Sequence, residues 1–152
     1  MHPNEELIAR FYDAFNRLEA EEMVACYAPD VTFEDPAFGE LHGEEARSMW
    51  RMLTDNSQGI EIETRDLVAD DTHGSVRWTA RYTFSTGRPV VNEVDASFTF
   101  ENGLIKTHVD HFDMWKWSSQ ALGPSGTVLG WLPFFRRKVR RGARERLDKH
   151  MS

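Results

Sequence analysis

One short segment of the chain holds side chains that can transfer protons. Residues 106–113 read Lys-Thr-His-Val-Asp-His-Phe-Asp, a pattern typical of a β-strand whose side chains alternate between two faces. His108, Asp110 and Phe112 then share one face. Aspartate is depleted in strands, and a carboxylate on a covered face suits general acid/base chemistry. If this face meets solvent instead, Asp110 is an ordinary surface charge.

His108, two residues before Asp110, permits two interpretations. A histidine paired with a carboxylate can take part in proton transfer, whereas a half-buried histidine often does no more than hydrogen-bond a neighbour. Metal binding is a third alternative, because His111 and Asp113 are close in sequence. Alternation places those two residues on the opposite face, so we expect no metal site.

Two further residues have chemistry worth weighing. Asp35 precedes Pro36, and an aspartate at such a place usually bonds backbone N–H groups of a turn. Cys26, the only cysteine, is expected to pack in the core, and it excludes an intrachain disulfide. One cysteine and no secretory signal at the start favour a reducing, cytoplasmic location. Phosphate-binding loops and the G-x-S-x-G and H-E-x-x-H motifs do not occur, which excludes several enzyme classes.

The elements that must position these residues follow from two periodicities. Apolar residues recur at helical spacing in the first third of the chain and alternate with polar ones afterwards. Pro29 ends the second helix, and Asn102-Gly103 predicts a hairpin. The sequence predicts an α+β domain in which an antiparallel sheet packs on helices. The expected helices are 4–18, 20–28 and 44–55, and the expected strands are 31–34, 60–65, 76–85, 93–100 and 104–115, with a turn at 35–39.

Charge divides the chain into an acidic body and a basic tail. Residues 131–152 hold eight Lys or Arg against Glu145 and Asp148, while residues 1–130 hold 10 basic and 23 acidic side chains. Residues 117–135 carry no charge, but their glycines, prolines and polar side chains favour a structured loop over a membrane span. An acidic body repels phosphates, so we expect no nucleic-acid partner.

Several runs together resemble a known superfamily. Residues 7–12, 26–36 and His42-Gly43 resemble the first half of ketosteroid isomerase, while residues 102–105 and 111–115 resemble the wider nuclear transport factor 2-like superfamily. That superfamily includes SnoaL-like polyketide cyclases and limonene epoxide hydrolase. The resemblance covers about residues 4–117, so we expect a SnoaL-like domain at 1–117 and a separate C-terminal loop and basic helix at 118–152.

The resemblance implies a cone-shaped sheet around an apolar pocket, no cofactor, and a homodimer through the outer sheet face. It implies that Asp35 and Asp110 are acid/base carboxylates and that His108 lies in the same cavity. A small apolar molecule is the expected ligand. The residues expected to bind it are Phe11, Tyr12, Phe15, Trp50, Trp78, Tyr82, Phe98 and Phe112.

The chain also departs from the patterns of these enzymes. Phe11 stands where the isomerase has its oxyanion tyrosine, although Tyr12 is adjacent, and Ala96 stands where it has a second oxyanion carboxyl, with Asp95 next to it. The epoxide hydrolase has Arg-x-Asp on a middle strand, and here Arg81 is followed by Thr83. Because these domains host isomerases, hydrolases, cyclases and binders, both an acid/base enzyme and a non-catalytic binding or interaction module remain as predictions.

The C-terminal segment leaves further alternatives open. Its loop at 122–126 and the aromatic run 131–135 could cover the mouth of the pocket. Phe135, Val139, Ala143 and Leu147 form a narrow apolar line along a basic helix. Such a helix can pack on the acidic body or on a partner subunit, or it can rest on an anionic membrane surface.

Overall fold

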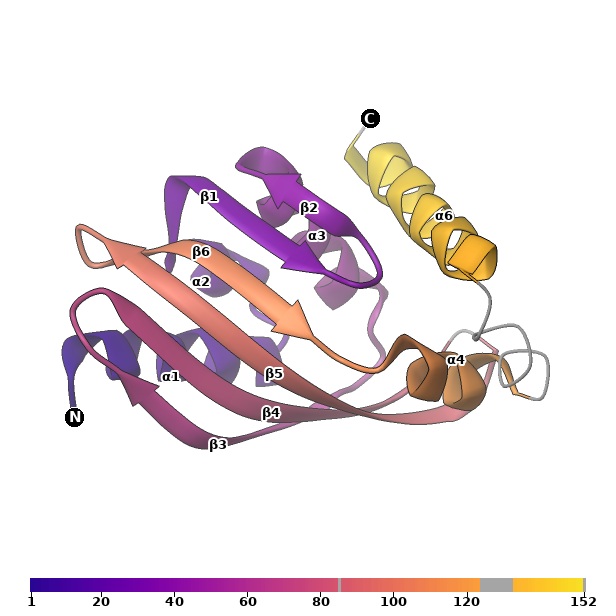
Figure 1. Cartoon of the computed structure of the whole chain (residues 1–152), viewed down its shortest axis with the longest axis horizontal. Coiled ribbons are helices and arrows are strands. Elements are labelled where there is room, and N and C mark those ends of the chain that lie inside the picture. The colour runs from indigo at the N-terminus through magenta and orange to yellow at the C-terminus, as the bar shows by residue number, and fades with distance from the viewer. Residues whose placement is uncertain (85, 124–132, 152) are drawn as a thin grey trace.

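The computed structural model of the chain describes residues 1–84, 86–123 and 133–151, with side chains for all of these except 133–139. Helices α1 (Pro3–Asn16), α2 (Ala20–Val24) and α3 (Glu44–Asn56) lie together behind one face of a curved sheet (Figure 1). The predicted α+β class, with a curved sheet packed on helices, is confirmed. Along the described residues, no helix is long and apolar enough to cross a membrane.

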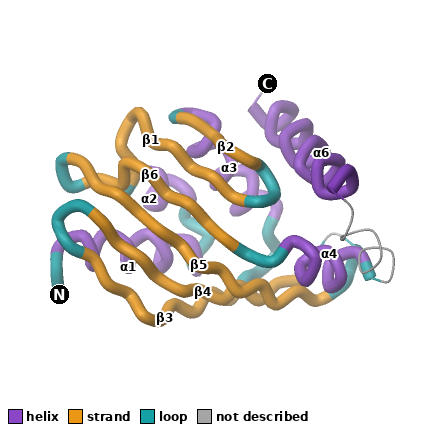
Figure 2. Tube along the Cα trace, in the orientation of Figure 1, coloured by secondary structure: helices purple, strands orange, loops and turns teal. Residues whose placement is uncertain are grey.

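The sheet contains β1 (Tyr27–Asp35), β2 (Gly39–His42), β3 (Glu61–Ala69), β4 (His73–Thr83), β5 (Pro89–Glu101) and β6 (Leu104–His111). Their spatial order is β2-β1-β6-β5-β4-β3, and Figure 2 shows this arrangement in strand colour. Four of the neighbouring pairs are antiparallel. The pair β1–β6 is parallel, so the sheet is mixed at the place where the candidate residues lie.

The helix predicted over 20–28 is wrong in its second half. It ends at Val24, and strand β1 begins at Tyr27. The reason is tertiary, because Tyr27 lies opposite Ile105 in β6 and the Ile105 N–H donates to the Cys26 carbonyl. Strand β1 also starts four residues earlier than predicted and includes Pro29. A proline is tolerated there because the β1–β6 register shifts between Tyr27 and Thr32.

The end of the last strand also differs from the prediction. Strand β6 stops at His111, and helix α4 (Met114–Leu122) follows it. Asp113 is the N-cap residue of α4, since its side chain accepts the Lys116 N–H at 3.0 Å. The strand predicted to Trp115 and the loop predicted from Trp117 are therefore wrong up to Leu122.

Two predicted turns are confirmed. Asn102 and Gly103 both have positive φ (54° and 79°) and join β5 to β6, as a two-residue hairpin turn requires. The turn after Asp35 joins β1 to the short strand β2, which was not predicted. This hairpin sets the position of Asp35 at the end of an inner strand.

The basic tail forms helix α6 (Pro133–Met151), which packs against α3 (Figure 1). Ala143 and Leu147 are buried there, and Arg144 pairs with Glu45 of α3 at 3.1 Å. Of the alternatives left open for the tail, packing on the chain's own acidic body is the one that these contacts show. The expected cover by the aromatic run 131–135, and Val139 of the apolar line, lie outside the described side chains.

Candidate functional site

The inner face of the sheet carries the candidate residues of β6. His108 has no exposed surface and Asp110 retains 3%, while His111 on the opposite face is exposed. The face of β6 that carries His108 and Asp110 is therefore the covered one, and the face that carries His111 meets solvent. Since His111 points outward and Asp113 caps α4, neither joins His108 and Asp110, and the described residues contain no group of three or more metal-binding side chains.

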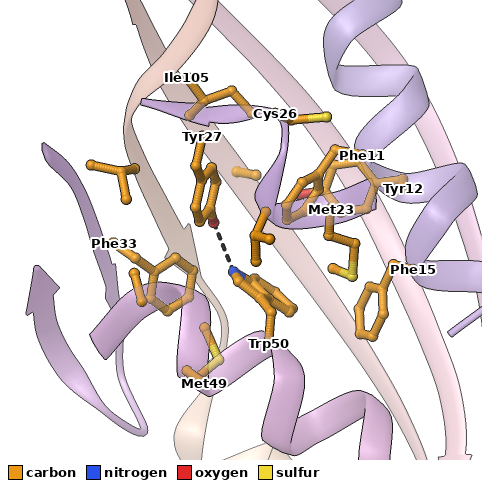
Figure 3. Close-up of a cluster of buried hydrophobic side chains, with 14 of the residues drawn as sticks. Phe11, Tyr12, Phe15, Met23, Cys26, Tyr27, Phe33, Met49, Trp50 and Ile105 are labelled. Carbon is orange, nitrogen blue, oxygen red and sulfur yellow. Dashed lines mark hydrogen bonds between the residues drawn. The ribbon is translucent and has the colours of Figure 1, made fainter. Parts of the chain in front are cut away.

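A chain of hydrogen bonds runs from α3 to Asp110. The Trp50 indole N–H donates to the Tyr27 hydroxyl oxygen at 2.8 Å (dashed in Figure 3). The same hydroxyl lies 2.8 Å from His108 Nδ1, and His108 Nε2 lies 2.9 Å from Asp110 Oδ1. Every donor finds an acceptor if the Tyr27 O–H donates to Nδ1 and the imidazole carries its proton on Nε2. The chain then presents one N–H to the Asp110 carboxylate and fixes the orientation of both groups.

Aromatic rings enclose this chain. The His108 ring lies 4.4 Å from the Phe98 ring, 5.0 Å from Phe33 and 5.5 Å from Phe11, measured between centroids. Such surroundings have a low dielectric, in which a hydrogen bond to a charged group is strong and an unpaired charge is costly. The Tyr12 hydroxyl comes within 3.5 Å of His108 Nε2. Burial raises the pKa of Tyr12 well above its ordinary value, and the charge of Asp110 adds to this.

The expected pocket residues divide into two groups. Six of them belong to the hydrophobic core, namely Phe11, Tyr12, Phe15, Trp50, Trp78 and Phe98. All of these except Phe98 are joined by direct ring contacts. Tyr82 and Phe112 are half-buried, and the Tyr82 hydroxyl accepts the Trp117 indole N–H at 2.8 Å. In the first group, Phe11, Trp50 and Phe98 pack against His108, whereas Tyr82 is held by α4. Ligand binding by either group stays a prediction.

Asp35 lies beside Asp110 on the neighbouring strand. Phe33 and Glu34 are opposite His108 and Val109 in the parallel pair, so Asp35 is level with Asp110, and adjacent strands are only about 4.8 Å apart. Asp35 Oδ1 also accepts the Phe38 N–H at 2.6 Å, which is the turn-stabilising role expected of an aspartate before a proline. The inner face thus brings two carboxylates to one place.

Desolvation raises the pKa of Asp35 to about 7. The Phe38 N–H opposes this shift, the negative charge of Asp110 adds to it, and the Arg140 guanidinium on α6 opposes it. Arg140 is placed by hydrogen bonds of 3.3 and 3.4 Å to the Pro36 carbonyl. A carboxyl with this pKa exchanges its proton near neutral pH, as an acid/base group requires.

Sequence reasoning missed Tyr27 and Arg140. Tyr27 was expected inside a helix, and only its pairing with β6 brings it to His108. Arg140 was one of many charges on the tail, and no local pattern marks it. The parallel β1–β6 pairing positions Tyr27, and the docking of α6 positions Arg140. Neither contact follows from residue spacing.

Two hollows lie on the outer face of the sheet. One, of about 660 Å³, is lined by residues that include Val68, Ser75, Thr107 and Val109. The other, of about 410 Å³, is lined by charged side chains that include Arg65, Arg77 and Asp95. A homodimer through this face stays a prediction, as does the apolar pocket inside the cone.

Comparison with known proteins identifies the relationship. Residues 8–108 match the model of the SnoaL-like domain. The chain belongs to the SnoaL-like family. The match includes Asp35 and His108, whereas Asp110, α4 and α6 lie beyond its end. No curated protein matches the chain significantly.

Solved structures share the fold of this SnoaL-like chain. An epoxide hydrolase of Mycobacterium tuberculosis, described as LEH-like, is 19% identical over 86% of this chain and 96% of its own, with a TM-score of 0.68. IdmH of Streptomyces antibioticus, a proposed polyketide cyclase, is 22% identical over 79% and 98%, with a TM-score of 0.66. An NTF2-like protein of unknown function from Burkholderia pseudomallei is 24% identical over 74% and 92%, with a TM-score of 0.64. At these identities the likeness shows a common fold.

Proposed function

We propose that this SnoaL-like protein is a cofactor-independent acid/base enzyme that acts on a small apolar molecule. Asp110 transfers the proton, His108 holds the carboxylate in position, and Asp35 exchanges a second proton at the mouth of the site. The observation that carries the proposal is the chain from Trp50 through Tyr27 and His108 to Asp110.

The energetic argument concerns the location of the pair. Moving a carboxylate out of water costs roughly several kcal/mol in desolvation free energy, and the attraction to a buried partner seldom offsets this cost completely. Apolar residues of similar volume would fill the same space at lower cost. His108 and Asp110 nevertheless occupy the aromatic interior with three further hydrogen-bonding side chains. A function that needs the carboxylate there accounts for that cost.

The two carboxyls suit complementary roles. The Asp110 Oδ1 atom is held by His108, which leaves Oδ2 as the oxygen that can receive a substrate proton. Asp35, whose pKa lies at about 7, is partly protonated at neutral pH and can donate. A base and an acid on neighbouring strands can abstract a proton at one carbon and return one nearby, the sequence of steps in an isomerisation or a cyclisation. The structural likeness to the M. tuberculosis epoxide hydrolase and to IdmH supports a reaction of this broad class.

A proton-exchange assay tests the proposal before the natural substrate is identified. The protein is incubated in D2O with a panel of cyclic ketones and epoxides, and NMR measures deuterium incorporation next to the carbonyl and diol formation. We expect Asp110→Asn to lower the rate by about 10²–10⁴-fold, the usual contribution of a general base. Asp95→Asn is the matched control, because Asp95 is an exposed strand aspartate on the outer face. A rate that survives in Asp110→Asn would overturn the assignment.

The second candidate is a non-catalytic binding module of the same fold. It is favoured by Phe11 and Ala96, which replace the hydrogen-bonding groups of ketosteroid isomerase, and by the close packing of the inner aromatic rings. The same assay separates the two candidates. Binding of a panel member without exchange or hydrolysis in the wild type would favour this module.

A further inference from the structure

The Trp78 indole N–H is the unusual polar group of the interior. Trp78 is only 6% exposed, and within the described part of the chain its Nε1 is the one buried side-chain nitrogen or oxygen without a hydrogen-bond partner. Buried N–H groups are almost always paired, and leaving one unpaired costs about 1–3 kcal/mol. The indoles of Trp50 and Trp117, by contrast, each donate to a tyrosine hydroxyl at 2.8 Å.

Tyr12 lies between Trp78 and the acid/base cluster. The Tyr12 ring is 5.3 Å from the Trp78 ring, and its hydroxyl is 3.5 Å from His108 Nε2. The Phe15 ring is 6.0 Å from the Trp78 ring. Trp78 therefore belongs to the same aromatic interior as His108.

Strand register places Trp78 two strands away from Asp110 on the inner face. Trp78 in β4 is opposite Val94 in β5, and Ala96 in β5 is opposite Asp110 in β6. Two strand spacings, combined with the offset of two residues between Val94 and Ala96, separate the Cα atoms of Trp78 and Asp110 by about 12 Å. Ala96 contributes only a methyl group beside Asp110. The donor and the carboxylate thus face the interior at a separation that a small substrate can span.

We propose that the Trp78 N–H binds the carbonyl oxygen of an apolar substrate whose reacting carbon meets Asp110. This inference rests on the function proposed above and narrows the substrate class to carbonyl compounds. A neutral N–H suits an oxygen that gains negative charge during proton abstraction, because such donors stabilise a developing oxyanion. Trp78 thereby takes the place of the oxyanion-binding groups whose positions Phe11 and Ala96 occupy.

Two probes of equal shape isolate the hydrogen bond. They are 1-acetonaphthone, which has a carbonyl oxygen, and 1-isopropenylnaphthalene, in which a CH2 group replaces that oxygen. In wild-type protein labelled with ¹⁵N in the indoles, we expect the ketone alone to shift the Trp78 N–H proton resonance downfield. Calorimetry should show tighter binding of the ketone by about 3–10-fold, the value of one net hydrogen bond.

Matched variants assign the effect to one indole. Trp78→Phe keeps an aromatic ring and removes the N–H, so the two probes should then bind with about equal affinity. Trp117→Phe, which removes an indole that already has a partner, should keep the preference. If Trp78→Phe does not fold, the two probes compared on the wild type still decide. The inference would be overturned if both probes bound with equal affinity or if neither bound. It would also be overturned if the ketone left the Trp78 N–H resonance unshifted because that N–H contacts water.

The binding preference between the two probes can be measured whether or not the protein turns over a substrate. A ketone preference in a protein that exchanges no protons would support the role of Trp78 and count against the proposed enzyme. Turnover that depends on Asp110 without any ketone preference would do the reverse.

Discussion

The two faces of the central sheet treat charge in opposite ways. On the outer face, Arg77 lies 3.3 Å from Asp95, and Arg81 lies 3.1 Å from Glu63, all in contact with water. On the inner face, His108 and Asp110 are paired at 2.9 Å inside a shell of aromatic rings. Exposed pairs contribute about 0–1 kcal/mol, whereas separating a buried pair is far more costly. The difference indicates that the inner pair is the better candidate for a functional role, because it is kept where burying a charge costs the most free energy.

The largest expected effect tests whether the inner face holds the molecule together. Phe11 is fully buried, and its ring lies 5.3–5.5 Å from Tyr27, Trp50 and His108. Phe11→Ala should lower the free energy of unfolding by about 3–5 kcal/mol, because the cavity cannot close. Arg77→Ala on the outer face should change it by less than about 0.5 kcal/mol. Urea unfolding measures both, and similar midpoints for the two variants would contradict the comparison.

A smaller effect tests the hydrogen-bond chain. Tyr27→Phe leaves the Trp50 N–H and His108 Nδ1 without their partner, so the free energy of unfolding should fall by about 1–3 kcal/mol. Tyr82→Phe is a matched control, because the Tyr82 hydroxyl also accepts an indole N–H at 2.8 Å but is half-buried. Water can replace it, and its loss should cost less than about 1 kcal/mol. Equal losses in urea unfolding would show that burial does not strengthen the inner chain.

Sequence alternation predicted part of this site. It placed His108 and Asp110 on one face and His111 on the other, because a strand has a period of two. It could not show which face is covered, since that depends on the helices packed behind the sheet. The resemblance to the nuclear transport factor 2-like superfamily supplied the expectation that the covered face is that of Asp110.

The remaining parts of the site depend on contacts between distant segments. Tyr27 reaches His108 across 81 positions of sequence, through a parallel pairing that also ends α2 early. Asp113 looked like a strand residue, yet it caps α4, because a short polar side chain suits both an alternating pattern and an N-cap position. Arg140 approaches Asp35 only because Ala143 and Leu147 dock α6 on the body. Local periodicity contains none of this information.

Asp35 lies at the end of β1, on the inner face beside Asp110. The pKa of Asp35 is raised from 3.8 to about 7, so the folded protein holds a proton that the unfolded chain has released. Stability from this proton is fully present below about pH 4 and is lost as the pH rises toward 7. Asp35→Asn, which stays neutral and can still accept the Phe38 N–H, should not lose it. Urea unfolding between pH 5 and pH 8 should show the wild type weakening relative to this variant.

The smallest expected effect concerns the charge that the tail brings to Asp35. Because Arg140 lowers the pKa of Asp35, Arg140→Gln should raise that pKa further and move the loss of stability to higher pH. Arg146→Gln is the control, since Arg146 donates to Gly142 of its own helix. Carboxyl ¹³C NMR follows Asp35 directly in each protein. An unchanged titration in Arg140→Gln would mean that water screens the guanidinium, and that α6 affects the site through packing alone.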